Sequence, residues 1–134
     1  MRYLLDTNVF IAAMKGVARV RERLSAIPAA DLVLSPVVLG ELEFGVRKSG
    51  HREANARRLA AVAGQFEWVA LDAAVAMRYG DLRAALESKG QPIGANDLWI
   101  AAQALALGLT LVTDNLSEFG RIKGLRLENW LREA

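Results

Sequence analysis

Short, largely apolar segments alternate along this chain with longer segments of helical periodicity. Strands that alternate with helices and are apolar on both faces are typical of a parallel sheet covered by helices on each side. Five segments are expected to be strands: Tyr3–Leu5, Leu32–Leu34, Trp68–Leu71, Leu109–Val112 and Leu125–Leu127. The alternation therefore predicts an α/β fold with a central parallel sheet.

The helices are expected between these strands, where apolar residues recur every three or four positions. Ser35 and Pro36 open one of them, since Ser is a good N-cap and Pro a good first helical residue. Gly108 ends the last one. The expected helices are Asn8–Met14, Ala18–Ile27, Val37–Lys48, Arg52–Val62, the segment from Asp72 to Ser88, and Asp97–Leu107.

Length and composition describe a soluble globular chain. The 134 residues are 53% hydrophobic and 24% charged, which predicts a single domain over residues 1–134. The chain has no cysteine, so disulfides, zinc–cysteine sites and thiol catalysis are excluded. Asp6 interrupts the first apolar stretch, and no apolar run reaches the roughly 20 residues of a membrane span. We expect a cytoplasmic protein without a membrane segment.

Carboxylates and amides follow two of the predicted strands. Asp6 ends the first strand, and Asp114 and Asn115 come after Thr113 at the end of the fourth. Ligands of open parallel sheets bind beyond the carboxyl ends of the strands, so these side chains should share one edge. Asp97 heads a helix that is apolar nearly all round, but the pattern alone does not fix the edge at which that helix starts.

Glu41 interrupts an apolar stripe of the predicted helix. The residues three and four positions away from it, including Phe44, are all apolar. Glu43, by contrast, lies four positions from Arg47 and can reach solvent or that basic partner. A carboxylate on a core-facing stripe is costly unless it is paired or binds a metal. Glu41 is therefore a candidate site residue, although pairing with an arginine is a simpler explanation.

Each of the other acids also has a simple explanation. Asp6 and Asp97 can be N-caps, worth about 1 kcal/mol each, and Glu118 can be a solvated loop residue. Several acids without an adjacent basic residue nevertheless repel one another, and a divalent cation relieves this repulsion. The single histidine, His51, lies in a polar stretch and is expected on the surface. The remaining ligands are hard oxygens, which favour Mg²⁺ or Mn²⁺ over zinc.

Four segments together resemble one known family. They are L-L-D-T-N-V-F-I, S-P-V-V-L-G-E-L-E-F-G, P-I-G-A-N-D-L-W-I-A-A-Q-A and L-V-T-D-N-L-S-E-F-G-R-I-K-G-L-R-L-E-N-W. Their order and spacing are similar to those of PIN-domain proteins, above all the VapC ribonuclease toxins of type II VapBC toxin–antitoxin systems. The resemblance covers the chain almost end to end. It implies a three-layer α/β/α sandwich with an acidic pocket that binds Mg²⁺ or Mn²⁺.

The resemblance also assigns the acids of that pocket. Asp6, Glu41 and Asp97 occupy the family's acidic positions, and Asp6 and Asp97 are expected to contact the metal directly. Family members often carry an aspartate where this chain has Asn115. We therefore expect Glu118 to be the fourth acid, with Asp114 as its rival.

Polar neighbours of the acids are expected in supporting roles. Ser35 and Thr113 either orient the acids and hold water, or serve only as a helix cap and a strand-end hydroxyl. The expected supporting residues are Asn8, Ser35, Thr113 and Asn115.

The function that the resemblance implies is a metal-dependent endoribonuclease acting as a toxin. It would cleave structured RNA, typically tRNA, be blocked by a cognate VapB-type antitoxin, and form a homodimer or a heteromer with that antitoxin. Between Lys15 and Arg58 the chain has nine basic residues against five acidic ones. This excess suits either RNA binding or ordinary solvated helix faces.

Two other functions compete with this one. The first is a catalytically impaired PIN-like module that only binds RNA or protein; the intact set of Asp6, Glu41 and Asp97 argues against it, while Asn115 keeps it open. Phosphotransfer through an aspartyl nucleophile typically uses D-x-D, and this chain has Asp6-Thr7-Asn8 instead.

Overall fold

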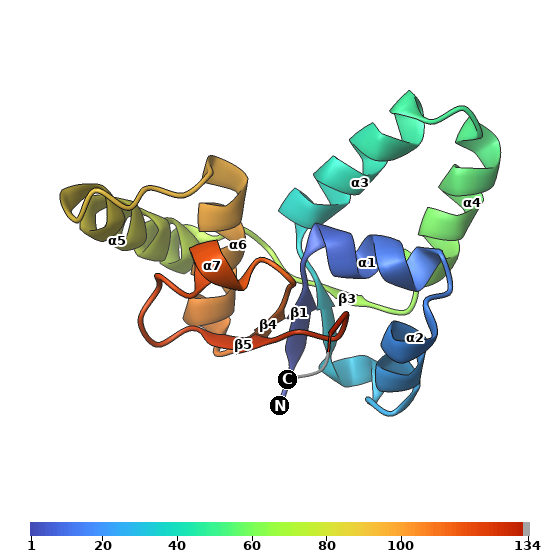
Figure 1. The fold of residues 1–134 in the computed structure, drawn as a ribbon, viewed down its shortest axis with the longest axis horizontal. Helices are drawn as coiled ribbons and strands as arrows, with labels where there is room; N and C mark the ends of the chain where they lie inside the picture. Colours follow the sequence, from blue (N-terminus) through green and yellow to red (C-terminus); the bar gives the residue numbers. More distant parts are fainter. Residues whose placement is uncertain (133–134) are drawn as a thin grey trace.

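A five-stranded sheet forms the centre of the protein, and all of its strand pairs are parallel, as predicted. The computed structural model describes residues 1–132 (Figure 1). The strands are β1 (Tyr3–Leu5), β2 (Leu32–Leu34), β3 (Glu67–Trp68), β4 (Thr110–Val112) and β5 (Arg126–Glu128). Their order in the sheet is β3-β2-β1-β4-β5, which puts β1 in the middle.

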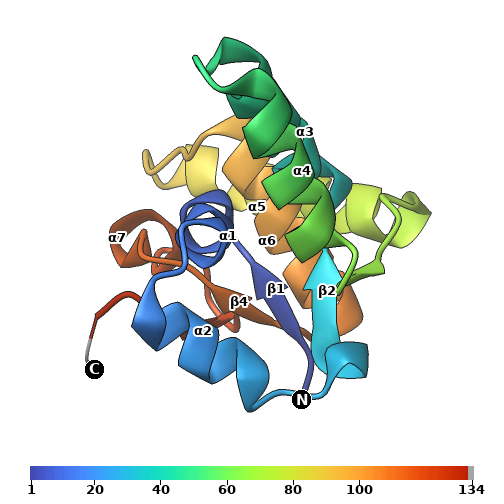
Figure 2. The ribbon, with the colours of Figure 1, turned by 90° about the vertical axis from the view of Figure 1, so that its right-hand side faces the viewer.

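Helices cover both faces of this sheet. They are α1 (Thr7–Met14), α2 (Ala18–Ser25), α3 (Pro36–Lys48), α4 (Arg52–Ala63), α5 (Ala73–Ser88), α6 (Ala95–Leu107) and α7 (Leu116–Phe119), with a 3₁₀ turn at Ala29–Asp31. Figure 1 shows α1 to α4 on one side of the strands and α5 to α7 on the other, and Figure 2 shows the first group in front of the sheet. The three-layer α/β/α sandwich is therefore confirmed.

Some predicted boundaries are wrong. The third strand was expected at Trp68–Leu71, but β3 covers only Glu67–Trp68, followed by one more bond to β2, from the Val69 N–H to the Leu34 carbonyl oxygen at 3.2 Å. The buried Gln103 amide donates hydrogen bonds to the carbonyl oxygens of Val69 (3.2 Å) and Ala70 (3.3 Å), which holds them away from the sheet ladder. The expected helix Ala18–Ile27 ends at Ser25, and α7 was not predicted at all.

The core lies on both faces of the three central strands. Leu4, Leu34 and Leu111 have no exposed surface, as expected for strands covered on both sides. Phe10 of α1 and Phe66, just before β3, pack with ring centroids 5.2 Å apart. Within residues 1–132, no helix combines the length and the apolar character needed to cross a membrane.

The topology fixes where a ligand site should lie. The chain passes from β1 to β2 and β3 on one side, and then returns to β4 on the other side of β1. The strand order thus reverses between β1 and β4, and such a reversal opens a crevice beyond the carboxyl ends of the two strands. Asp6 and Thr113 follow these two strands directly and lie at that crevice.

Two glycines give a matched test of the helix ends. Gly108 ends α6 with a left-handed φ of 65°, whereas Gly80 lies inside α5, where an added Cβ would meet nothing within 4 Å. Gly108→Ala should destabilise the protein by about 1 kcal/mol, and Gly80→Ala should stabilise it by about 0.5–1 kcal/mol. Urea unfolding measures both. Changes of the same sign would contradict this account of the two backbone conformations.

Candidate active site

Asp6 lies where β1 and β4 end side by side. Its backbone N–H donates to the carbonyl oxygen of Val112 at 2.8 Å, which ties it to the last residue of β4. One carboxylate oxygen accepts the backbone N–H of Thr7 (2.8 Å), and the other accepts the Thr113 hydroxyl (2.8 Å). Asp6 is therefore the N-cap of α1, as the simpler interpretation of its sequence position predicted. It is also a buried carboxylate at the crevice.

Burial and hydrogen bonds act on Asp6 in opposite directions. Burial raises the pKa of Asp6, while the bonds from Thr113 and Thr7 partly offset that rise, and the charge of Asp114 adds to it. The two hydrogen bonds hold the carboxylate in one orientation. Asp6 is thus an ordered oxygen donor at the bottom of the site.

Asp97 lies in the first turn of α6 and is not its cap. Gly94 is the N-cap, and Asp97 is the third residue of the helix, so the N-cap interpretation of Asp97 is wrong. Because α6 descends past the sheet to enter β4 from below, it must begin at the edge where the strands end. That topology brings Asp97 to the same crevice as Asp6.

Three other acids of the crevice affect the pKa of Asp97. Burial raises its pKa to about 7, helped first by the negative charge of Asp6, then by contact with Glu118, and then by the charge of Glu41. Burial is the largest cause of this rise, and the carboxylates of Asp6, Glu118 and Glu41 add to it because they lie near Asp97. The structure therefore brings together the four acids that were expected to form the site.

Glu41 reaches the crevice from the edge of α3. The buried face of this helix is formed by Val38, Leu42 and Val46, while Phe44 is 63% exposed. The stripe expected to place Glu41 against the core is thus only partly correct, and Glu41 is half-buried. The Thr7 hydroxyl donates to it at 3.2 Å. Burial raises its pKa, and the charge of Asp6 adds to that rise against the effect of the hydrogen bond.

Thr7 is a site residue that the sequence analysis missed. Its backbone N–H binds Asp6 and its hydroxyl binds Glu41, so it links two acids from different elements. Nothing in the sequence pattern distinguished Thr7 from any other residue in a first helical turn. Its role depends on how α1 packs against α3.

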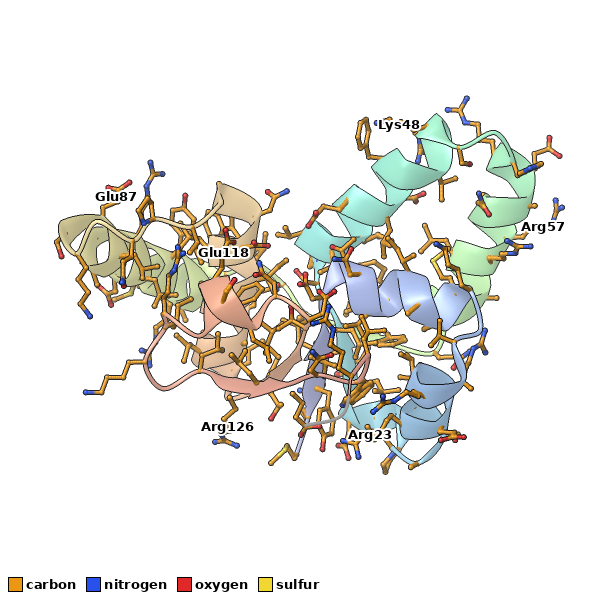
Figure 3. The ribbon with its side chains drawn as sticks, viewed as in Figure 1. Arg23, Lys48, Arg57, Glu87, Glu118 and Arg126 are labelled. Atoms are coloured by element: carbon orange, nitrogen blue, oxygen red, sulfur yellow. The ribbon has the colours of Figure 1, made fainter. Side chains whose placement is uncertain are left out.

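Glu118 is presented by α7. Asn115 caps this short helix, and its side-chain amide donates to the Glu118 carboxylate at 3.1 Å. Figure 3 shows Glu118 on α7 beside α6, consistent with its contact with Asp97. The signal for α7 was present in the sequence, since an N-cap residue followed three positions later by Glu is a helix-start signature.

Asp114 lies on a different side of the site. The Asn8 amide donates to it at 3.4 Å, and its charge raises the pKa of Asp6 but does not contribute to that of Asp97. Glu118 and Asp114 thus approach different partners. The contact with Asp97 favours Glu118 as the fourth acid.

The remaining polar residues fall into two groups. Ser35 is fully buried and accepts the backbone N–H of Val37 at 3.1 Å, so it is a helix cap. Thr113 does more than end its strand, because it donates to Asp6 and accepts the backbone N–H of Asn115 at 3.0 Å. His51 is exposed, as expected.

The acids have no basic partner in the part of the chain that the structure describes. The ion pairs there involve other carboxylates, including Glu43 with Arg47 at 3.1 Å, and the arginine partner suggested for Glu41 is absent. Among residues 1–132, no group of three or more His, Cys, Asp or Glu side chains is arranged so that it could hold a metal ion. The donor chemistry still fits a divalent cation, since the cluster consists of hard carboxylate oxygens whose mutual repulsion is not neutralised.

The basic residues of the Lys15–Arg58 segment are all exposed on the α1 to α4 layer. Figure 3 shows three of the basic residues of this layer, Arg23 on α2, Lys48 on α3 and Arg57 on α4. Arg23 is paired with Glu128 at 2.6 Å and stacks over Trp130. The layer offers exposed cations, and both interpretations of this basic excess stay open.

The raised pKa of Asp97 predicts how the stability of metal-free protein depends on pH. The folded protein keeps a proton on Asp97 between pH 3.8 and about 7, where the unfolded chain has lost it. The free energy of unfolding should therefore fall as pH rises through this window and level off above it. Allowing for solvent screening of the half-exposed side chain, the change is about 1–2 kcal/mol.

Asp97→Asn removes this dependence and should be more stable than the wild type at pH 8 but not at pH 4. Thermal melts in EDTA across this range measure the difference, and Asp81→Asn, an exposed acid on α5, controls for the loss of a carboxylate. Parallel pH profiles for the wild type and Asp97→Asn would be inconsistent with the clustered acids.

Comparisons with known proteins agree with this geometry. The PIN domain family matches residues 3–125. The chain is 41% identical to Ribonuclease VapC2 of Rickettsia felis, covering 97% of this chain and 98% of that protein. It is 37% identical to the tRNA(fMet)-specific endonuclease VapC of Shigella flexneri, with the same shares covered.

A similar solved structure is that of VapBC2 from Rickettsia felis bound to a DNA fragment from their promoter. The TM-score is 0.92 at 40% sequence identity, and the alignment covers 97% of this chain and 99% of that one. The similarity thus extends over the whole sandwich, including every element that carries an acid.

Proposed function

This chain belongs to the PIN-domain family, among the VapC proteins, and we propose that it is a metal-dependent endoribonuclease, the toxin of a type II toxin–antitoxin system. One observation carries the proposal. Asp6, Glu41 and Glu118 lie close enough to Asp97, beyond the ends of β1 and β4, to add to the effect of burial, which is the largest cause raising the pKa of Asp97 to about 7. Such a cluster is costly to fold unless it binds a cation.

PIN-domain nucleases use divalent metal ions, and the ion proposed here is Mg²⁺, with Mn²⁺ as a substitute. Asp6 and Asp97 are the proposed direct ligands, while Glu41 and Glu118 complete the charge around them. A bound divalent ion supplies an activated water and stabilises the charge that develops on the scissile phosphate.

The chain's own residues prepare the site for this chemistry. Thr113 and the Thr7 backbone fix the two oxygens of Asp6, and the Thr7 hydroxyl holds Glu41. Asn115 holds Glu118 at 3.1 Å. These bonds keep the acids from rotating away from one another, which lowers the cost of arranging them around a cation.

The proposed substrate is structured RNA, with tRNA as the first candidate. A relative is named as a tRNA(fMet)-specific endonuclease, and the exposed basic residues of the α1 to α4 layer suit a phosphate backbone. Binding that depends on such contacts weakens as salt rises.

The proposed partner is a VapB-type antitoxin that blocks the acidic crevice, and the proposed assembly is a homodimer or a heteromer with that antitoxin. A related solved structure is a VapBC complex bound to promoter DNA. The protein is proposed to act in the cytoplasm as a single PIN domain over residues 1–134.

A second candidate function is a catalytically impaired module that binds RNA or protein. Asn115 keeps it open, because members of the family often carry an aspartate at this position. Asn115 nevertheless caps α7, and its side-chain amide holds the Glu118 carboxylate. Glu118 therefore supplies a carboxylate in place of the aspartate that is absent at position 115. This arrangement favours the active enzyme.

Incubation of the purified protein with bulk tRNA distinguishes these functions. Cleavage should occur with Mg²⁺ or Mn²⁺, disappear on addition of EDTA, and return when excess metal is restored. Metal-independent cleavage would overturn the mechanism. Tight RNA binding without cleavage under any of these conditions would support the impaired module.

A further inference from the structure

Glu128 and Trp130 belong to the segment L-R-L-E-N-W, which contributes to the family resemblance but has no part in the acidic cluster. The match to the PIN domain family ends at residue 125, just before β5, so it assigns these two residues no role. Both side chains are nevertheless held in place. Trp130 is 3% exposed, and Glu128 is half-buried at the last position of β5.

Three side chains form a closed set of contacts at this point, which we call the clasp: Arg23 of α2, Glu128 and Trp130. The Arg23 guanidinium donates to the Glu128 carboxylate oxygen Oε1 at 2.6 Å, and the indole N–H of Trp130 donates to the same oxygen at 3.0 Å. The guanidinium also lies over the indole ring, 5.3 Å from its centroid. Glu128 is therefore fixed by two donors that contact each other.

Trp130 connects the clasp to the centre of the sheet. Its ring packs against Tyr3, the first residue of β1, with ring centroids 5.6 Å apart. An edge strand has a neighbour on one side only, and β5 is three residues long, so few ladder hydrogen bonds hold its end. The clasp gives this end a second support, because it joins β5 to α2 and to the strand that leads to Asp6.

The backbone of Glu128 leads to the acids of the crevice. Its carbonyl oxygen accepts the backbone N–H of Thr113 at 2.9 Å. Thr113 is fully buried, and its N–H would lose its partner if the Glu128 carbonyl moved. The hydroxyl of the same threonine donates to the Asp6 carboxylate oxygen Oδ2 at 2.8 Å. The position of Glu128 is thus transmitted to Asp6 through one residue.

We propose that Glu128 is a positioning residue for the metal site: the clasp fixes the end of β5, which holds Thr113 and thereby keeps one oxygen of Asp6 in a single orientation. The inference rests on the proposed role of Asp6 as a metal ligand. Hydrogen-bonding partners that orient a metal ligand contribute to metal affinity. Thr113 is such a partner, and Glu128 supports it from the next strand.

The clasp contributes more to position than to stability. The side chains of Arg23 and Glu128 are 51% and 31% exposed, and an ion pair exposed to this degree adds little to the stability of a fold. Its geometry is more specific, since the carboxylate oxygen is shared with the indole N–H of Trp130. Binding of an RNA phosphate by Arg23 fits less well, because Glu128 already neutralises its charge.

Titration of Mn²⁺ followed by electron paramagnetic resonance, in the absence of RNA, tests this role. Thr113→Val removes the hydroxyl and should weaken Mn²⁺ binding by about 10- to 100-fold. Glu128→Ala acts through Thr113 and should weaken it by roughly 2- to 30-fold. Glu128→Gln keeps an oxygen that accepts both hydrogen bonds of the clasp, and it should bind Mn²⁺ nearly as tightly as the wild type.

Glu67→Ala is the matched control. Glu67 begins β3, the opposite edge strand, and pairs with Arg2 at 2.9 Å, so this variant loses a similar exposed ion pair at the end of the sheet away from the crevice. Its Mn²⁺ affinity should equal that of the wild type.

A double variant tests the route through Thr113. Glu128→Ala combined with Thr113→Val should bind Mn²⁺ no more weakly than Thr113→Val alone, because both changes act on the same hydrogen bond to Asp6. Additive losses of affinity would overturn the proposed route.

Amide hydrogen exchange separates a failure of the clasp from a failure of the metal site. In metal-free protein the Thr113 amide should exchange faster in Glu128→Ala than in the wild type or in Glu67→Ala. If the wild type binds no Mn²⁺, the metal site fails, and this exchange still shows whether the clasp holds Thr113. If the wild type binds Mn²⁺ and Glu128→Ala binds it equally well, only the positioning role of Glu128 is overturned. A change confined to the KM for bulk tRNA would also overturn it and would assign the clasp to RNA binding.

Discussion

Asp97→Asn should abolish RNA cleavage while leaving the fold intact, and Asp6→Asn should do the same. Both residues are proposed direct ligands of the cation, and an amide supplies neither the charge nor the full donor capacity of a carboxylate. Metal stabilisation of a phosphoryl transition state is worth several kcal/mol, so the rate should fall on the order of 10³-fold or more. Single-turnover cleavage of bulk tRNA in Mg²⁺ measures this.

Glu43→Gln is the matched control for these substitutions. Glu43 is a half-buried acid on α3, two residues from Glu41, but it pairs with Arg47 outside the cluster. Its loss should change the cleavage rate by less than the experimental scatter. Full activity in both aspartate variants would rule out the proposed mechanism.

Glu118→Gln should reduce cleavage more than Asp114→Asn. Glu118 contacts Asp97 and is held by Asn115, whereas Asp114 interacts with Asn8 and affects only Asp6 within the cluster. Loss of a group that supports the metal ligands typically costs about 10- to 100-fold. We expect that range for Glu118→Gln and a smaller change for Asp114→Asn, measured side by side under the same single-turnover conditions.

The order of these two effects decides the fourth acid. A larger loss in Asp114→Asn would make Asp114 the fourth acid and would reduce Glu118 to a helix residue. Asn115→Ala separates the roles further, because it should weaken cleavage through Glu118 and add nothing to Glu118→Gln.

The sheet was predictable because its strands carry their own signal. A strand covered on both faces must be apolar throughout, and β1, β2 and β4 are short runs of this kind. The end of β3 was not predictable in the same way. It depends on Gln103, a residue on a helix more than thirty positions away, whose amide binds the carbonyls that follow the strand.

The site could be predicted in part. Asp6 follows a strand, and parallel strands end at one edge, so its position follows from local pattern and a general rule. The position of Asp97 could not be predicted without the complete topology. Only the path of the chain from α6 into β4 fixes the edge of the sheet at which α6 begins. The cap explanation, reasonable for an isolated aspartate, holds for Asp6 and fails for Asp97.

Glu41 shows how a correct assignment can rest on a partly wrong reason. The pattern placed it on a core-facing stripe with Phe44, but Phe44 is exposed and the core face lies at Val38 and Leu42. Thr7 shows the opposite case. Its hydroxyl bonds to a residue 34 positions away, and no local pattern carries that information.

Direct measurement of Mn²⁺ binding tests the central claim that these acids form one divalent-cation site. Electron paramagnetic resonance of free Mn²⁺, titrated with wild-type protein in the absence of RNA, reports binding without depending on cleavage. We predict saturable binding by the wild type and by Glu43→Gln, and loss of that binding in Asp6→Asn and Asp97→Asn. Equal Mn²⁺ binding by all four proteins would contradict the claim.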